Sequence, residues 1–203
     1  MYFCRRMEKE VKEEMIKRSI IEDSKKVFQK YGYYKVTMDD ISKATKKARS
    51  TLYYYFKDKG DVFNAVMNAE IKELLDNLEE SISKETTAAE KFAALVLNKY
   101  KFFKPKIHQY SLVMGELHHD ETVLHDFRKT YIKREIALLN SIMKEGIKKR
   151  EFIRRREEDI AFLAESFVLG FQAIERYLSF EDLKIDYIPK LKLHVEILLK
   201  GLS

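Results

Sequence analysis

The stretch TMDDISKATKKARSTLYYYFKDKGDVF, from Thr37 to Phe63, carries two short helical patterns joined by a brief turn. The first begins at Thr37-Met-Asp-Asp40, a capping-box-like sequence in which the Thr37 hydroxyl is placed to accept a free backbone N–H. The second begins near Arg49 or Ser50, and a longer helical pattern that stops at Gly32 precedes both. This order predicts a helix-turn-helix, whose second helix lies in the major groove of DNA.

Three consecutive tyrosines, Tyr53 to Tyr55, stand on the second short helix. Neighbouring helix residues point about 100° apart, so one face cannot bury all three rings. Leu52, Tyr55 and Phe56 share one side of the helix, which predicts that Tyr55 is buried beside the other two. The residues left facing outward are Ser50, Thr51, Tyr53 and Tyr54.

The outward residues have the chemistry that DNA contacts require. Hydroxyl groups can bind phosphate or base edges, and a tyrosine ring can meet a thymine methyl group. Arg49 can reach guanine or the backbone, and Lys59 can meet a phosphate together with the amides at the start of the next helix. The predicted DNA-binding residues are Thr37, Lys46, Lys47, Arg49, Ser50, Thr51, Tyr53, Tyr54 and Lys59. Periodicity alone leaves a packed three-helix bundle with an incidental polar face as the alternative.

The charge of the chain is concentrated near its start. The formal net charge is +6, and residues 1–70 contain 16 basic and 11 acidic side chains. A basic first third favours contact with a polyanion, and an ordinary basic surface is the alternative. The single cysteine, Cys4, excludes an internal disulfide and fits a reducing compartment. With no signal-peptide pattern and no run of ~20 apolar residues, the sequence predicts a cytoplasmic protein without a membrane span.

Helical spacing of apolar residues continues along the whole chain. The 203 residues include only 6 glycines and 2 prolines, and no strand alternation is visible. The pattern turns Ile41 and Ala44 inward on the first short helix and predicts that a later helix ends at Pro105. The predicted fold is all-α, with about nine helices. Residues 1–60 form a tail and the three-helix DNA-binding domain, and residues 61–203 form a larger helical bundle.

The quoted stretch resembles the DNA-binding region of the TetR/AcrR family of bacterial transcriptional regulators, and the resemblance is strong from about Ser19 to Phe63. The matching residues are Phe28, Gly32, Thr37, Ile41, Ala44, Thr51, Leu52, Tyr53, Tyr55, Phe56 and Lys59.

The turn departs from the family pattern, which usually has Gly-Val-Ser where this chain has Lys46-Lys47-Ala48. A non-glycine residue in a left-handed turn position costs about 1 kcal/mol. The stem of Lys47 would have to pack where a small apolar residue usually lies, and Ala48 cannot cap the recognition helix. The two lysines could offset these costs by attracting phosphate.

The resemblance implies that the bundle senses a small molecule and forms a homodimer through its last two long helices, here about Glu157–Ser179 and Lys184–Leu202. The expected dimer residues are Phe167, Gly170, Phe171, Ile174, Leu191, Val195 and Leu198. The alternative is that these stripes fill the core of the monomer. The ligand is expected among the middle helices, lined by Tyr100, Phe103, Tyr110, Met114, Phe127 and Tyr131.

Some polar clusters have plainer interpretations. The run HHDETVLH, with His118, His119, Asp120 and His125, loosely matches metal-ligand spacing, but a solvated helix junction is favoured and no metal or cofactor is expected. The basic run from Lys148 to Arg156 is interpreted as a solvated linker, with an anion-entry or lipid-facing role as its alternative.

The leading hypothesis is a sequence-specific transcriptional regulator, a repressor whose affinity for a palindromic operator in double-stranded DNA is controlled by a small-molecule ligand. The alternative is a helical dimeric DNA-binding protein of low sequence specificity with an architectural role. An enzyme is not expected, because the chain has no P-loop, no Gly-rich nucleotide motif and no nucleophile elbow.

Overall fold

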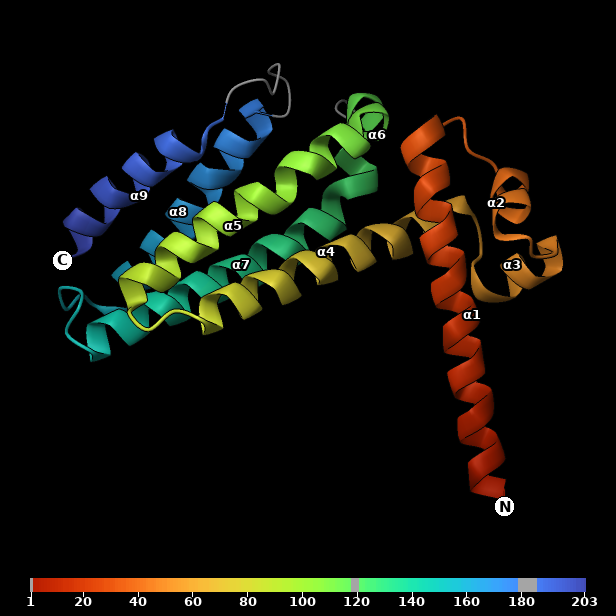
Figure 1. Cartoon of the computed structure of the whole chain (residues 1–203), viewed down its shortest axis with the longest axis horizontal. Coiled ribbons are helices and arrows are strands. Elements are labelled where there is room, and N and C mark those ends of the chain that lie inside the picture. Colours follow the sequence, from red (N-terminus) through yellow and green to blue (C-terminus); the bar gives the residue numbers. More distant parts are fainter. Residues whose placement is uncertain (1, 118–120, 179–185) are drawn as a thin grey trace. The chain divides into compact units, whose positions relative to one another are not determined.

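The computed structural model describes residues 2–117, 121–178 and 186–203, with side chains over 7–117, 129–174 and 186–203. In that part of the chain every regular element is a helix, as predicted (Figure 1). The helices are α1 (Tyr2–Tyr31), α2 (Met38–Thr45), α3 (Arg49–Tyr55), α4 (Lys59–Ser83), α5 (Ala88–Gln109), α6 (Ser111–Leu117), α7 (Glu121–Lys148), α8 (Glu157–Leu178) and α9 (Ile188–Leu202). None of them is both long and apolar enough to cross a bilayer.

The chain divides into two compact units. One comprises Met1–Ile71 with Gln109–Phe127, and the other comprises Lys72–His108 with Arg128–Ser203. Helix α6 therefore belongs to the unit that contains the helix-turn-helix, although it follows α5 in the chain. The predicted functional boundary near residue 60 stays a prediction.

The first unit is built around the aromatic rings of α1 and α4. Phe28 and Phe63 are fully buried, and their ring centroids lie 5.1 Å apart in an edge-on arrangement. The same core holds Ile41 of α2 and Leu52 of α3, which are both fully buried. Each short helix contributes few apolar side chains, so both depend on α1 and α4 for their stability.

The start of α2 is the predicted capping box. The Thr37 hydroxyl accepts from the backbone N–H of Asp40, and the Asp40 carboxylate accepts from the backbone N–H of Thr37. The Thr37 hydroxyl also donates to the Asp40 carboxylate at 2.6 Å, and this hydrogen bond, together with that from the Thr37 backbone N–H, lowers the pKa of Asp40. The prediction for Ala44 is wrong, because Ala44 is exposed and Thr45 is buried instead. The helix lasts only eight residues, so its inward face is set by Ile41 and Thr45, one turn apart.

Two further expectations about helix limits are wrong. The expected N-terminal tail is helical, because α1 runs unbroken from Tyr2 to Tyr31. Helix α5 does not end at Pro105 but continues to Gln109. A proline removes one backbone N–H and disfavours a helix interior, yet packing of the surrounding turns can outweigh that cost.

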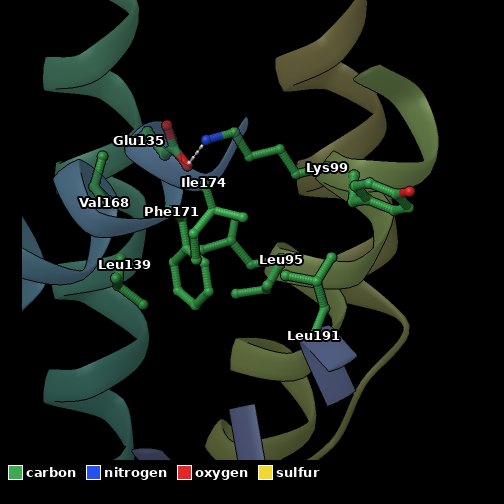
Figure 2. A pocket seen from close by; sticks show the side chains of 10 residues that line it. Leu95, Lys99, Glu135, Leu139, Val168, Phe171, Ile174 and Leu191 are labelled. Atoms are coloured by element: carbon green, nitrogen blue, oxygen red, sulfur yellow. Dashed lines mark hydrogen bonds and ion pairs between the residues drawn. The ribbon is translucent and has the colours of Figure 1, made fainter. Parts of the chain in front are cut away.

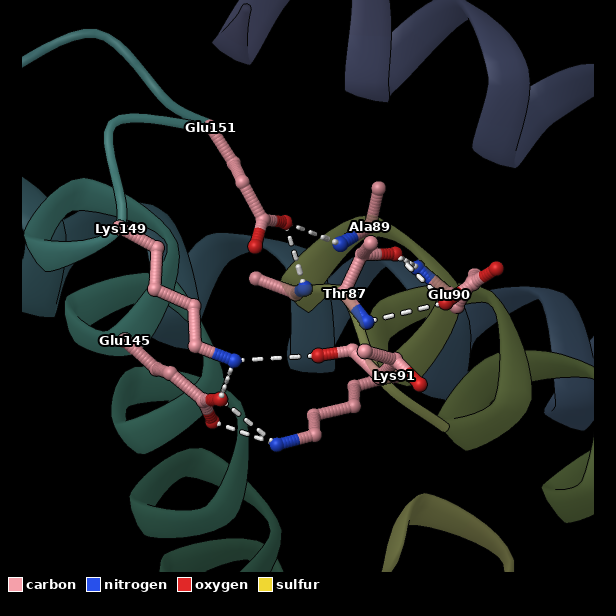
Figure 3. Close-up of polar contacts among 9 residues, drawn as sticks. Thr87, Ala89, Glu90, Lys91, Glu145, Lys149 and Glu151 are labelled. Carbon is pink, nitrogen blue, oxygen red and sulfur yellow. Dashed lines mark hydrogen bonds and ion pairs between the residues drawn. The ribbon is translucent and has the colours of Figure 1, made fainter. Parts of the chain in front are cut away.

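The second unit is a helical bundle held at one end by a polar cluster (Figure 3). Glu151 accepts from the backbone N–H of Ala88 at 2.6 Å and so caps the start of α5. The Glu145 carboxylate of α7 binds the ammonium groups of Lys91 at 2.7 Å and Lys149 at 2.8 Å. These two hydrogen bonds lower the pKa of Glu145 to about 2. The cluster ties α7 to the start of α5.

This pKa predicts how acid affects the bundle. A carboxyl group whose folded pKa is depressed stabilises the fold above its unfolded pKa, and that stability is lost as the pH falls through the folded value. The stability difference between wild type and Glu145→Gln should therefore be constant above about pH 5 and shrink between about pH 4.5 and 2. Urea unfolding of both proteins at a series of pH values measures this difference in the free energy of unfolding. Glu79→Gln, at an exposed position of α4, is the control for the loss of one negative charge.

Candidate DNA-binding face and ligand cavity

The recognition helix α3 presents two of its three tyrosines to solvent. Tyr53 and Tyr54 are 54% and 68% exposed, while Leu52 is fully buried. Tyr55 is only half-buried and packs at the edge of the core, so the prediction of full burial is wrong. The physical reason is that α3 ends at Tyr55 and Phe56 has an extended backbone, which lets Phe56 take the buried position.

Two predicted DNA-binding side chains have partners within the unit. The Arg49 guanidinium forms an ion pair with Asp39 of α2, and both side chains remain largely exposed. The Tyr54 hydroxyl donates to Glu13 of α1 at 3.2 Å. Exposed contacts of this kind contribute little to stability and can be exchanged for phosphate or base contacts. Their roles toward DNA stay predictions.

The turn between α2 and α3 has the predicted geometry. Lys46 lies in the left-handed region with φ 53°, and Lys47 is half-buried. Ala48 is the N-cap of α3 and makes no side-chain hydrogen bond. The turn is held instead by Ser42, whose hydroxyl donates to the carbonyl oxygen of Lys47 at 2.7 Å.

Relieving the left-handed lysine should stabilise the unit. Lys46→Gly is expected to raise the free energy of unfolding by up to about 1 kcal/mol, because glycine adopts this conformation without a Cβ clash. It should also flatten the slope of log Kd against log salt by about 0.9 if the ammonium contacts a phosphate. Lys46→Asn, which tolerates the left-handed region but removes the charge, separates the two effects. An unchanged slope in both variants would remove Lys46 from the DNA contacts.

Lys59 has a structural role that the sequence did not indicate. Its ammonium group donates to the carbonyl oxygens of Tyr33, Tyr34 and Val36 at 3.1, 2.9 and 3.1 Å. It also lies 4.9 Å from the centroid of the Tyr33 ring. Lys59 therefore fixes the loop between α1 and α2. Its predicted phosphate contact stays a prediction.

Glu116 of α6 holds the other side of the same loop. Its carboxylate accepts from the backbone N–H groups of Tyr33 at 2.5 Å and Tyr34 at 3.1 Å. Gly32 precedes them with φ 80°, and a Cβ there would lie 2.6 Å from the Glu116 Cδ atom. Only glycine leaves room for this carboxylate, so α6 is tied directly to the loop that leads into the helix-turn-helix.

A second buried contact lies against α4 and is made by Tyr110, the residue just before α6. The Tyr110 hydroxyl donates to Glu70 at 2.8 Å, and Glu70 also pairs with Lys25 of α1. Burial and the neighbouring carboxylate raise the pKa of Tyr110. Helix α6 is thus joined by Glu116 to the loop after α1, and the preceding Tyr110 is joined to α4 and, through Glu70, to α1.

The bundle contains a small cavity of about 20 Å³ between α5, α7, α8 and α9 (Figure 2). Its lining is Leu95, Val96, Lys99, Tyr100, Glu135, Leu139, Val168, Phe171, Ile174 and Leu191. Figure 2 shows the Lys99 ammonium meeting the Glu135 carboxylate beside the apolar side chains. The volume is far below the ~300–1,000 Å³ of ordinary ligand pockets, so a larger ligand would require the helices to separate.

Of the six expected ligand-binding residues, the cavity is lined by Tyr100 alone among the described side chains. Tyr131 is buried near it, with its ring centroid 5.5 Å from the Lys99 ammonium, and Phe103 is half-buried outside the lining. Tyr110 and Met114 pack in the core of the other unit, and their role toward a ligand stays a prediction. The side chain of Phe127 lies outside the described residues, as do those of His118, His119, Asp120 and His125.

Lys99 and Glu135 were missed by the sequence reasoning, although a signal was present. Lys99 follows Leu95 and Val96 by one helical turn, and Glu135 follows Tyr131 by one turn, so both charges interrupt apolar stripes. Charged residues on a buried face are rarely found unless they are paired.

The expected dimer residues mostly face the interior of their own chain. Phe171 and Leu191 line the cavity with Ile174, and Val195 is buried. The Phe167 ring lies 5.8 Å from that of Phe92 in an edge-on arrangement. These five side chains pack within their own bundle, and their role in dimer contacts stays a prediction. Leu198 is half-buried, and Gly170 is exposed with open space around it.

Comparison with known proteins agrees with this architecture. The model of the family described as bacterial regulatory proteins, tetR family, matches residues 20–66. Residues 20–66 are a DNA-binding region of the TetR type. The chain is a DNA-binding transcriptional regulator.

Several relatives match 90% or more of the chain's length. It is 26% identical to the fatty acid metabolism regulator protein of Bacillus subtilis (strain 168) over 186 residues, which are 90% of this chain and 93% of that protein. The fatty acid degradation regulator FadR of Bacillus halodurans superposes with a TM-score of 0.72 at 25% identity, covering 92% of this chain and 99% of that one. FadR of Bacillus subtilis in complex with stearoyl-CoA gives 0.73 at 22% identity, with coverage of 92% and 99%.

Proposed function

We propose that this chain is a TetR-family repressor that releases a palindromic operator when a long acyl chain enters the cavity between α5, α7, α8 and α9. The observation that carries the proposal is the cavity itself, whose lining is apolar except at Lys99, Glu135 and Tyr100. The relatives named as fatty acid regulators, one of them crystallised with stearoyl-CoA, support an acyl effector.

In this proposal the two predicted domains have separate roles. Residues 1–60 would bind double-stranded DNA, and residues 61–203 would hold the effector and the dimer contact. An acyl chain needs the helices of the bundle to move apart, and α5 leads directly into α6. A displaced α6 would pull on the Glu116 contact with Tyr33 and Tyr34. That contact is the route by which the effector would lower operator affinity. Binding to chromosomal DNA would place the protein in the cytoplasm.

The dimer would form through the outward faces of α8 and α9. Four large apolar side chains are exposed there, at helical spacing on each helix. They are Phe162 (69%), Leu169 (47%), Leu193 (57%) and Ile197 (59%). Gly170 and Gly201 have open space around them, which would allow a partner helix to approach closely. A two-fold dimer would set two α3 helices about 34–36 Å apart for the two operator half-sites.

Gel shifts at fixed salt test the function. The protein should bind DNA from its own promoter about 10³-fold or more tightly than scrambled DNA, and palmitoyl-CoA at micromolar concentration should release the promoter complex. Equal affinity for both DNAs would support the architectural alternative. If the protein binds its promoter specifically and no acyl-CoA affects that binding, the protein remains a sequence-specific regulator, but the proposed effector is wrong.

Tyr54 provides a sharper test of the DNA face. Tyr54→Ala should weaken operator binding about tenfold, because a ring and a hydroxyl are lost from a helix in the major groove. It should change the free energy of unfolding by less than about 0.5 kcal/mol, because the ring is 68% exposed. Tyr31→Ala, at an exposed tyrosine outside α3, is the control and should leave DNA affinity unchanged. Equal losses of operator affinity in the Tyr54 and Tyr31 variants would mean that α3 presents another face to the DNA.

A further inference from the structure

The most unusual group in the bundle is the ion pair between Lys99 of α5 and Glu135 of α7. The Lys99 Nζ and Glu135 Oε1 atoms lie 2.5 Å apart, and the two side chains are only 2% and 3% exposed. Other ion pairs of this unit retain more contact with water, such as Lys91–Glu145 at 17% and 31%. Removing two charges from water costs more than apolar packing of the same volume, so stability alone does not favour this pair.

The pair lies where a ligand would meet it. Both side chains line the cavity, whose remaining walls are formed by apolar side chains and Tyr100. They are the charged groups of that lining, and they come from two helices that a ligand would have to part (Figure 2). A cavity of this kind fixes an apolar chain by its walls and fixes the orientation of the ligand by its few polar groups.

The hydrogen bonding of Glu135 is incomplete. Its Oε1 atom accepts from Lys99, but its Oε2 atom is buried and has no hydrogen-bond partner among the described residues. A buried acceptor without a donor costs about 1–3 kcal/mol. A ligand that supplies a donor at this point would recover that cost. Beside it, the Lys99 ammonium offers N–H donors to an acceptor on the ligand.

We propose that the Lys99–Glu135 pair recognises the thioester head of an acyl-pantetheine ligand. Lys99 would donate to the acyl carbonyl oxygen, and Glu135 Oε2 would accept from the first amide N–H beyond the sulfur. The acyl carbonyl and this amide N–H lie close together in a pantetheine thioester. The Lys99 ammonium and the Glu135 carboxylate lie close together in the same way. A fatty acid carboxylate offers acceptors but no donor, and it would bring a second negative charge beside Glu135. The inference rests on the proposed function and names its ligand class.

Titration calorimetry with three ligands tests the proposal. Palmitoyl-CoA has the thioester carbonyl and the amide, S-hexadecyl-CoA has the amide but no acyl carbonyl, and palmitate has neither thioester nor amide. Wild type should bind palmitoyl-CoA about tenfold more tightly than S-hexadecyl-CoA, as expected for one hydrogen bond to a charged group. It should bind palmitate more weakly still. Palmitoyl-pantetheine should bind like palmitoyl-CoA if the nucleotide contributes little.

The matched variant is the double substitution Lys99→Met with Glu135→Leu, which removes both charges and keeps the volume. It should bind palmitoyl-CoA and S-hexadecyl-CoA with affinities within roughly threefold of each other. A preference that persists in this variant, or a wild type that binds thioester and thioether alike, would overturn the inference but not the proposed function. Palmitate binding as tight as that of palmitoyl-CoA would overturn it as well. A wild type that binds none of the ligands would overturn the proposed function itself.

Discussion

Lys99→Met is expected to lower the free energy of unfolding by about 3–5 kcal/mol. The substitution leaves the Glu135 carboxylate buried at 3% exposure without its ammonium partner, and an uncompensated buried charge is among the costliest defects in a protein. Methionine fills a volume close to that of the lysine stem, so little of the loss comes from a cavity. Urea unfolding followed by circular dichroism measures it.

The double variant with Glu135→Leu separates charge from packing. Replacing both partners by apolar side chains should return the stability to within about 1 kcal/mol of wild type, or above it. Glu145→Gln at the exposed end of the bundle is the comparison, and it should cost far less than Lys99→Met because solvent screens the remaining charges. A double variant as unstable as the single one would show that the stems, and not the charges, hold α5 against α7.

Gly32→Ala is expected to lower the free energy of unfolding by about 3–5 kcal/mol. Part of the cost, about 1–2 kcal/mol, comes from placing a Cβ at φ 80°. The rest comes from Glu116, because the new Cβ overlaps its carboxylate and would push it away from the backbone N–H groups of Tyr33 and Tyr34. Because the loop leads into α2, operator affinity should fall in the same variant.

A double-mutant cycle isolates the part of the cost of Gly32→Ala that comes from Glu116. In a Glu116→Ala background the carboxylate is already absent, so Gly32→Ala should then cost only the backbone strain of about 1–2 kcal/mol. The coupling between the two sites should therefore be about 2 kcal/mol or more. Costs that simply add would show that Glu116 moves aside freely and that α6 does not hold the loop.

The local chemistry of the helix-turn-helix could be predicted because it depends on neighbouring residues. The capping box at Thr37 and the left-handed turn at Lys46 involve residues within a few positions of each other. The outward direction of Tyr53 and Tyr54 follows from helix geometry alone. Tyr55 was predicted wrongly because the end of a helix is decided by what packs there, and Phe56 takes the buried place with an extended backbone.

The position of α6 could not be predicted in the same way. Its apolar spacing indicates a helix, and the helix is present, but spacing does not say which core its side chains enter. Tyr110 and Met114 follow α5 in the chain and yet pack with Phe28 and Phe63, which lie far from them in sequence. The inward faces of α8 and α9 could not be predicted for the same reason, since each helix carries two apolar faces and only packing decides that the denser one closes the bundle.

The sequence by itself determined the all-α fold, the helix-turn-helix and the exposed face of its recognition helix, because these follow from periodicity, capping and spacing over a few residues. The tertiary structure alone decided which long-range pairs form. It brings Lys99 to Glu135 and Glu116 to the loop after Gly32, over separations of 36 residues for the first pair and 83 from Glu116 to Tyr33. Such pairs depend on how whole helices pack, and no local pattern in the chain records that packing.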